Sequence, residues 1–233
     1  MLGHMRSYSS LLCHILGSHP QIDGYCETHI KYRTRFDLLR LRSRVVKLTG
    51  EPLRGRYVLD KVLHNYPLTP GILRSSTTFG IVLVRRPVPS VQSIINMGLH
   101  YEDVAWHRDL EAVVQYYEGR LARLIRISDQ MPGRVVFIEA EALLSRTADV
   151  LHRLGALLGL GEPLRVEYRR FAHTGEGGFG DPSEVITLGR VANVTREPRT
   201  AVMVPPTLEA RLETAYACCV ASLRDRCEAL AAA

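Results

Sequence analysis

A polar segment near the start of the chain carries side chains that can bind an anion. Its candidate ligands are Arg6, Ser7, Tyr8, Ser9 and Ser10. An apolar stretch of good helix formers follows directly, and we expect a helix to begin at Ser9. The unpaired N–H groups and the dipole of a helix start attract phosphate, to which an arginine and hydroxyl groups add hydrogen bonds. Ser9 is equally typical of a plain N-cap, and the sequence lacks the G-x-x-x-x-G-K-[ST] pattern of nucleotide kinases.

A second cationic position follows the most apolar segment of the sequence. Residues 80–84 are continuously apolar and stop at Arg85. Such a segment predicts a strand buried on both faces, within a parallel sheet that helices cover. Ligands of these sheets bind beyond the carboxyl ends of the strands, so Arg85 would face that crevice and hold a phosphate, with Ser93 adding a hydrogen bond. Arg85 and Arg86 are also typical of surface charges that flank a strand.

Helix and strand patterns alternate around these two positions. Helical patterns cover residues 9–18, 30–46, 88–97, 106–130, 142–158 and 207–230, and strand patterns cover 57–61, 80–84 and 134–138. Residues 65–76 are rich in loop formers, and the glycine-rich residues 174–182 predict an irregular loop. This alternation predicts an α/β fold with a central parallel sheet flanked by helices. From a length of 233 residues we expect one domain.

The composition narrows the classes of partner. Lys and Arg number 30 against 24 Asp and Glu, which suits a polyanionic ligand, although a solvated arginine-rich surface is the ordinary alternative. The arginines are dispersed and no recognition motif appears, so nucleic acid is not expected. The five cysteines and nine histidines show no zinc spacing, and no metal is expected. No apolar run reaches the roughly 18 residues of a membrane span, and no signal-peptide layout appears, which predicts a cytoplasmic protein.

Two of these segments together resemble the sulfotransferases that use 3′-phosphoadenosine 5′-phosphosulfate (PAPS). Arg6-Ser7-x-Ser9-Ser10-Leu11-Leu12 is similar to their phosphosulfate-binding loop, which is usually Arg or Lys-Ser-Gly-Thr-Thr followed by apolar residues. Val84-Arg85-Arg86-Pro87 with Ser93 is similar to the motif that holds the 3′-phosphate. Leu16-Gly17-Ser18-His19-Pro20 followed by Glu27-Thr28 resembles the bacterial and tyrosylprotein branches. The resemblance implies a P-loop NTPase-like sulfotransferase fold for the whole chain.

The same resemblance implies roles for individual residues. Glu27 would be the general base that takes the proton of an acceptor hydroxyl, while Lys61 and Arg6 would stabilise the departing phosphate oxygen during in-line transfer. The nucleotide would be held by Arg6, Ser7, Tyr8, Ser9, Ser10, Arg85, Ser93 and Arg190, the last on a mobile covering segment over residues 174–200. The acceptor would be a hydroxyl of a small molecule, glycan or lipid, bound by loops at 31–44, 65–76 and 99–108. Without the resemblance, Glu27 is typical of a partly exposed acid at a helix start and Lys61 of a solvated loop lysine.

Two features depart from the family pattern. Tyr8 stands where the loop normally has glycine, and its side chain would crowd the phosphate or change the turn. Only Met1 and Leu2 precede Gly3, where a strand normally leads into the loop, so we expect a missing or shortened strand or a start farther upstream. These departures support one alternative, a non-catalytic descendant that binds a nucleotide or a partner. A P-loop kinase-like phosphotransferase, which would depend on magnesium and bind ATP, is the other alternative. The oligomeric state stays open.

Overall fold

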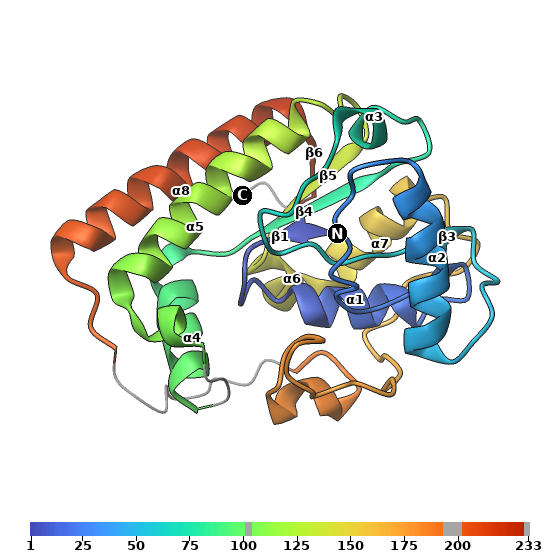
Figure 1. The fold of residues 1–233 in the computed structure, drawn as a ribbon, viewed down its shortest axis with the longest axis horizontal. Helices are drawn as coiled ribbons and strands as arrows, with labels where there is room; N and C mark the ends of the chain where they lie inside the picture. Colours follow the sequence, from blue (N-terminus) through green and yellow to red (C-terminus); the bar gives the residue numbers. More distant parts are fainter. Residues whose placement is uncertain (101–103, 193–201, 231–233) are drawn as a thin grey trace.

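The protein is built around a central parallel β-sheet (Figure 1). The computed structural model describes residues 1–100, 104–192 and 202–230. In the order β1-β4-β5-β6, the strands are β1 (Leu2–Gly3), β4 (Gly80–Val84), β5 (Val135–Glu139) and β6 (Glu228–Ala229). A second parallel pair joins β2 (Ile22–Asp23) to β3 (Tyr57–Val58), and one parallel bridge between Leu2 and Val62 brings the chain after β3 beside β1. The predicted α/β fold with a central parallel sheet is confirmed.

Helices cover both faces of this sheet, as the apolar pattern of β4 requires (Figure 1). Val82 and Val84 belong to one core with residues of α4 (Pro87–His100), α5 (Leu110–Ser128) and α8 (Pro206–Arg226). Ile81 and Leu83 point the other way, into a core with residues of α1 (Ser9–Gly17), α6 (Ala142–Ser145) and α7 (Thr147–Leu157). Every residue of β4 is buried, which confirms the strand predicted from its continuous apolar sequence.

Tertiary pairing changes several of the predicted element boundaries. The helix expected at 30–46 is α2 (Phe36–Thr49), because Tyr32 instead pairs with the chain at Pro67 and Thr69. The region 65–76 contains the short helix α3 (Pro70–Leu73), and the strand expected at 57–61 is only two residues long. Residues 228–229, expected in the last helix, form β6 against β5.

Two long helical patterns are each divided by a local break, one at a capping side chain and one at a non-helical residue. The pattern at 106–130 separates into η1 (Ala105–Arg108) and α5, because the Asp109 side chain accepts the Ala112 N–H and starts a new helix. The pattern at 142–158 divides into α6 and α7 at Arg146, whose φ of −133° is not helical. The glycine-rich residues 174–182 form turns without helix or strand, as predicted, before η2 (Glu184–Leu188).

Strand β1 has two residues but a central position. It pairs with β4 on one side and with Val62 on the other. The Arg120 side chain on α5 holds these segments together. Its guanidinium is fully buried and donates to the carbonyls of Gly3, Val62 and His64 and to the amide oxygen of Asn65. Burial lowers the pKa of Arg120 to about 10.

Candidate functional site

Four predicted site segments meet because each follows a parallel strand. The segment containing Arg6 follows β1, Glu27 follows β2, Lys61 follows β3, and Arg85 follows β4. Parallel strands present their carboxyl ends at one edge, where open α/β sheets bind their ligands. The topology therefore gathers three cationic side chains and a carboxylate from positions far apart in the sequence.

The loop after β1 has an unusual backbone. Both Arg6 and Tyr8 have φ of 61°, in the left-handed region that favours glycine. Tyr8 is the N-cap of α1, and no described side chain caps this helix start. The N–H groups of the first turn are consequently available to an anion. Ser7 has a structural role, since its buried hydroxyl donates to the carbonyl of His4 at 2.7 Å.

Arg85 packs onto this loop. Its guanidinium lies 4.4 Å from the centre of the Tyr8 ring and donates to the Arg6 carbonyl at 3.0 Å. Tyr8 thus adopts the glycine-type conformation and turns its ring toward an arginine. The Arg85 N–H donates to Nε2 of His4, whose Nδ1 must carry the proton because it faces the Met5 carbonyl. Burial lowers the pKa of His4 to about 3, so this ring stays neutral and serves as scaffold.

Lys61 lies between the helix start and the candidate base. Its Nζ donates to Ser10 Oγ at 3.0 Å and lies 3.3 Å from Glu27 Oε1. Lys61 is 2% exposed and Glu27 is 8% exposed, so both are removed from bulk water. The other carboxylate oxygen of Glu27 lies 3.9 Å from Nε2 of His64. This arrangement places a carboxylate, an ammonium and a hydroxyl within one small volume.

Asp60 fixes the backbone on both sides of this pair. Its Oδ1 accepts the N–H groups of Thr28 and Lys61, and its Oδ2 accepts the Tyr32 hydroxyl. Thr28 follows Glu27, so one buried carboxylate sets the relative position of the candidate base and the lysine. Burial raises the pKa of Asp60 despite these hydrogen bonds.

The glycine-rich segment folds across the same edge. Asp181 Oδ1 accepts from Arg6 Nη1 at 2.8 Å, while Arg6 Nε donates to Ser93 Oγ at 2.9 Å. Burial acts to raise the pKa of Asp181, but Arg6 and the N–H of Ser183 outweigh it and lower the pKa. A Cβ on Gly180 would lie 3.0 Å from Ser10 Oγ and 3.3 Å from Lys61 Nζ. The segment therefore passes directly over the candidate anion site.

The structure brings together nearly all the residues that the sequence predicted. Arg6, Ser7, Tyr8, Ser9, Ser10, Glu27, Lys61, Arg85 and Ser93 lie at this edge or in the helices that begin there. Arg190 is exposed and pairs through its backbone with Glu167. Its side chain makes no hydrogen bond or ion pair with the other predicted residues in the described part of the chain. Residues 193–200 of the predicted covering segment and residues 101–103 of a predicted acceptor loop lie outside the described residues.

Sequence reasoning missed Asp181, His4 and Asp60 as parts of this arrangement. Gly180-Asp181-Pro182 was expected to cover the site, but nothing local indicates that its carboxylate would contact Arg6, 175 residues away. Among the described residues, no group of three or more His, Cys, Asp or Glu side chains is placed to hold a metal ion. None of the helices in the described ranges has the length and apolar character needed to span a bilayer.

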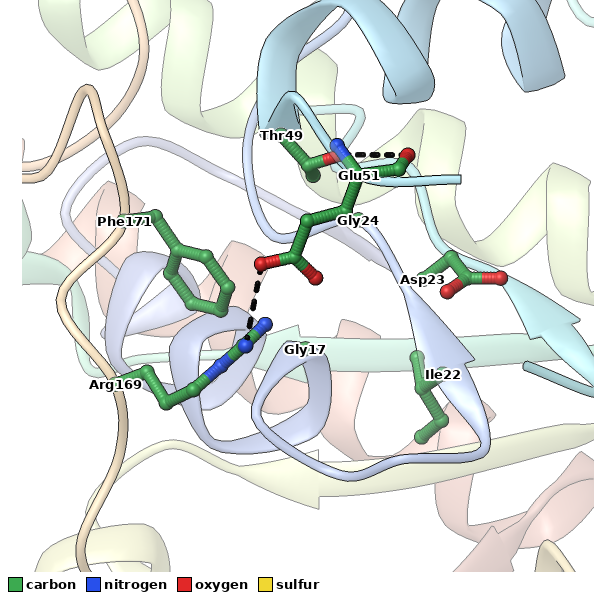
Figure 2. A pocket seen from close by; sticks show the side chains of 8 residues that line it. All are labelled: Gly17, Ile22, Asp23, Gly24, Thr49, Glu51, Arg169 and Phe171. Carbon is green, nitrogen blue, oxygen red and sulfur yellow. Dashed lines mark hydrogen bonds and ion pairs between the residues drawn. The ribbon is translucent and has the colours of Figure 1, made fainter. Parts of the chain in front are cut away.

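In the described part of the chain, a small cavity and an open groove lie outside the cluster of cations. Figure 2 shows the residues that line a small cavity at the C-terminal end of α1, beside the ion pair of Arg169 and Glu51. The cavity has a volume of about 20 Å³, and the ion pair is 3.3 Å long. It has room for about one water molecule and not for a substrate. The second is an open groove of about 550 Å³, lined by His29, Ile30, Lys31, Arg33, Thr34, Asp37 and Arg40. It begins two residues after Glu27, and its volume lies in the range of small-molecule sites.

The chain was compared with the models of known protein families and with curated proteins. Neither comparison gave a match. The function must therefore be argued from the residues and geometry of the site itself.

Proposed function

We propose that the chain is a sulfotransferase with a P-loop-like fold, which moves a sulfuryl group from PAPS to an acceptor hydroxyl. The observation that carries the proposal is the convergence of Arg6, Lys61 and Arg85 around the uncapped start of α1, with Glu27 3.3 Å from Lys61. Three cations and free N–H groups suit a strongly anionic nucleotide, and a carboxylate beside them suits deprotonation of a hydroxyl. The sequence resemblance supports the same assignment.

In the proposed transfer, one residue accepts the proton of the acceptor and others stabilise the charge that develops on the nucleotide. Bound PAPS would supply the sulfuryl group, held at the start of α1 and by Arg85. Glu27 takes the proton of the acceptor hydroxyl as that oxygen bonds to sulfur. The bond between sulfur and the bridging oxygen breaks, and its electron pair stays on that oxygen. Lys61 stabilises the resulting charge from its position between Glu27 and Ser10, so positioning and electrostatics carry the reaction.

The acceptor would bind in the open groove beside His29. This groove is lined by part of the loop at 31–44 that the sequence assigns to the acceptor. The ring nitrogen of His29 interacts with the Gly178 carbonyl at 2.8 Å, so the glycine-rich segment borders the groove as well as the anion site. One segment could thus close over both substrates, as loops that exclude water from reactions do.

The proposal is tested by calorimetric titration with 3′-phosphoadenosine 5′-phosphate, in parallel with ATP and magnesium. We expect micromolar binding of the first nucleotide and no comparable binding of the second. A preference for ATP with magnesium would replace the proposal with a phosphotransferase. Binding of the desulfated nucleotide without turnover of PAPS on a broad panel of hydroxyl acceptors would instead indicate a non-catalytic descendant.

Replacing Arg85 with alanine should weaken binding of 3′-phosphoadenosine 5′-phosphate. Loss of a charged hydrogen bond costs about 1.5–3 kcal/mol, which is roughly a 10- to 150-fold higher Kd. Part of the loss would come through the loop, because Arg85 also holds the Arg6 carbonyl and the Tyr8 ring. The matched control is Arg86→Ala, which removes the neighbouring exposed arginine. Equal affinity of the Arg85 variant and the wild type would contradict this assignment.

Replacing Asp181 with asparagine should tighten nucleotide binding. The carboxylate occupies a guanidinium nitrogen of Arg6 and places a negative charge where phosphates would lie. Removing one such charge is worth about 1 kcal/mol, or roughly fivefold in Kd. Calorimetry on Asp181→Asn measures the change, and Glu167→Gln, at an exposed position, controls for the altered net charge. Weaker binding would mean that Asp181 positions Arg6 for the ligand.

A further inference from the structure

The outer face of α2 is apolar although it faces solvent. Phe36 is 75% exposed, Leu39 is 60% exposed and Val46 is 38% exposed. Their helical spacing of 3 and 7 residues places all three on one side. The opposite side is already buried through Leu41, Val45 and Leu48, so the exposed stripe has no part in the core. The helix lies at the opposite side of the molecule from α8 (Figure 1).

Cations flank this stripe on both sides. Residues 31–47 contain the cations Lys31, Arg33, Arg35, Arg40, Arg42, Arg44 and Lys47, with Asp37 as the only acid. Asp37 is already satisfied, because it accepts the N–H groups of Arg33 and Thr34 and pairs with Arg40. The other six cations make no ion pair with any described residue; five of them are exposed, and Arg44 is partly buried. The face therefore combines apolar side chains with a large unbalanced positive charge.

This combination matches the surface of an anionic bilayer. A helix that lies in the membrane interface buries an apolar stripe among the acyl chains while flanking Lys and Arg contact lipid phosphates. A second copy of the chain would oppose like charges across the interface. Against nucleic acid, Phe36 and Leu39 would face charged phosphates and would find no apolar surroundings in which to be buried. We propose that the outer face of α2 docks the protein on membranes that contain anionic lipids.

The proposal goes beyond the proposed enzymatic function and does not depend on it. It has one consequence for the groove described above, which shares Lys31, Arg33 and Arg40 with this face. A docked protein would present that groove beside the lipid headgroups. Molecules that reside in the membrane would then reach it without leaving the bilayer surface.

Sedimentation with vesicles tests the proposal directly. The full chain, without nucleotide, is mixed with vesicles of phosphatidylcholine alone or with phosphatidylglycerol added. We expect binding to the anionic vesicles only. The double variant Phe36→Ser with Leu39→Ser should bind at least about tenfold more weakly, because two exposed apolar side chains no longer enter the bilayer. The double variant Arg35→Gln with Arg42→Gln should also bind the anionic vesicles more weakly than the wild type does. This difference should be largest at low salt, where the attraction between charges is least screened.

Two controls make the result decisive. Leu157→Ser removes an apolar side chain of α7 that is 45% exposed, and it should bind as the wild type does. Unchanged thermal unfolding of each variant shows that the fold is retained, which the exposure of these side chains leads us to expect. Failure of the full chain to bind anionic vesicles would overturn the proposal and favour an acidic protein as the partner. Undiminished binding by the Phe36 and Leu39 variant would also overturn it, since the net charge alone would then explain the attraction.

Discussion

Glu27→Gln should reduce turnover by roughly 100- to 10,000-fold, the range expected when a general base is lost. Glutamine keeps the shape of the side chain and can still accept a hydrogen bond from Lys61, but it cannot take a proton. Nucleotide affinity should stay nearly unchanged, because Glu27 contacts Lys61 and borders His64 without lying at the helix start. The measurement is release of 3′-phosphoadenosine 5′-phosphate from PAPS in the presence of mixed phenol, sugar and lipid alcohols.

The control for this prediction is Glu162→Gln, which neutralises an exposed carboxylate elsewhere on the chain. It should turn over as the wild type does. A Glu27 variant that retained full turnover would exclude Glu27 as the base and leave it as the structural partner of Lys61. A parallel loss of turnover and nucleotide affinity would point to a collapsed site, so both quantities are measured on the same preparation.

Arg120→Met should lower the free energy of unfolding by about 3 kcal/mol or more. The substitution leaves the carbonyls of Gly3, Val62 and His64 without their buried donor, and each unpaired group costs about 1–3 kcal/mol unless water reaches it. Urea unfolding followed by circular dichroism measures the change. The matched variant is Arg126→Met on the exposed side of the same helix, for which we expect a change within about 0.5 kcal/mol.

An equal loss in both α5 variants would contradict the assigned role of Arg120. The site should respond as well, since Arg120 holds Gly3, which precedes the anion loop, and Val62, which follows Lys61. We therefore expect Arg120→Met to bind 3′-phosphoadenosine 5′-phosphate more weakly even at temperatures where it is folded. Arg126→Met should bind it normally.

The parts of the fold that local sequence encodes were predictable. The continuous apolar run of β4 fixed its burial and placed Arg85 at the carboxyl edge, and the helix start at Ser9 agreed with the structure. Strand β6 could not be predicted from the local sequence, because Glu228 and Ala229 follow a helical pattern and form a strand only by pairing with β5. The start of α2 was missed for a similar reason, since Tyr32 is held by backbone pairing with Pro67 and Thr69.

The candidate site likewise contains residues that the sequence pattern predicts and residues that only long-range contacts bring into it. Residues that follow strands or begin helices, such as Arg6 and Lys61, could be found from their position in the pattern. Asp181 and His4 act through contacts with Arg6 and Arg85 that only the folded chain creates. The left-handed backbone of Tyr8 could not be predicted from the residue itself, because tyrosine rarely adopts this conformation.

The contact between Arg6 and Asp181 spans 175 residues of chain, and β1 likewise finds its partners only at Val62 and Val82. During synthesis, the segment around Arg6 therefore emerges long before the segments that complete its surroundings. Contacts between residues so far apart in sequence are typical of slowly folding topologies. Under the proposed function, nucleotide binding requires the anion loop that follows β1, so a bound nucleotide would report that these distant pairings of β1 have formed.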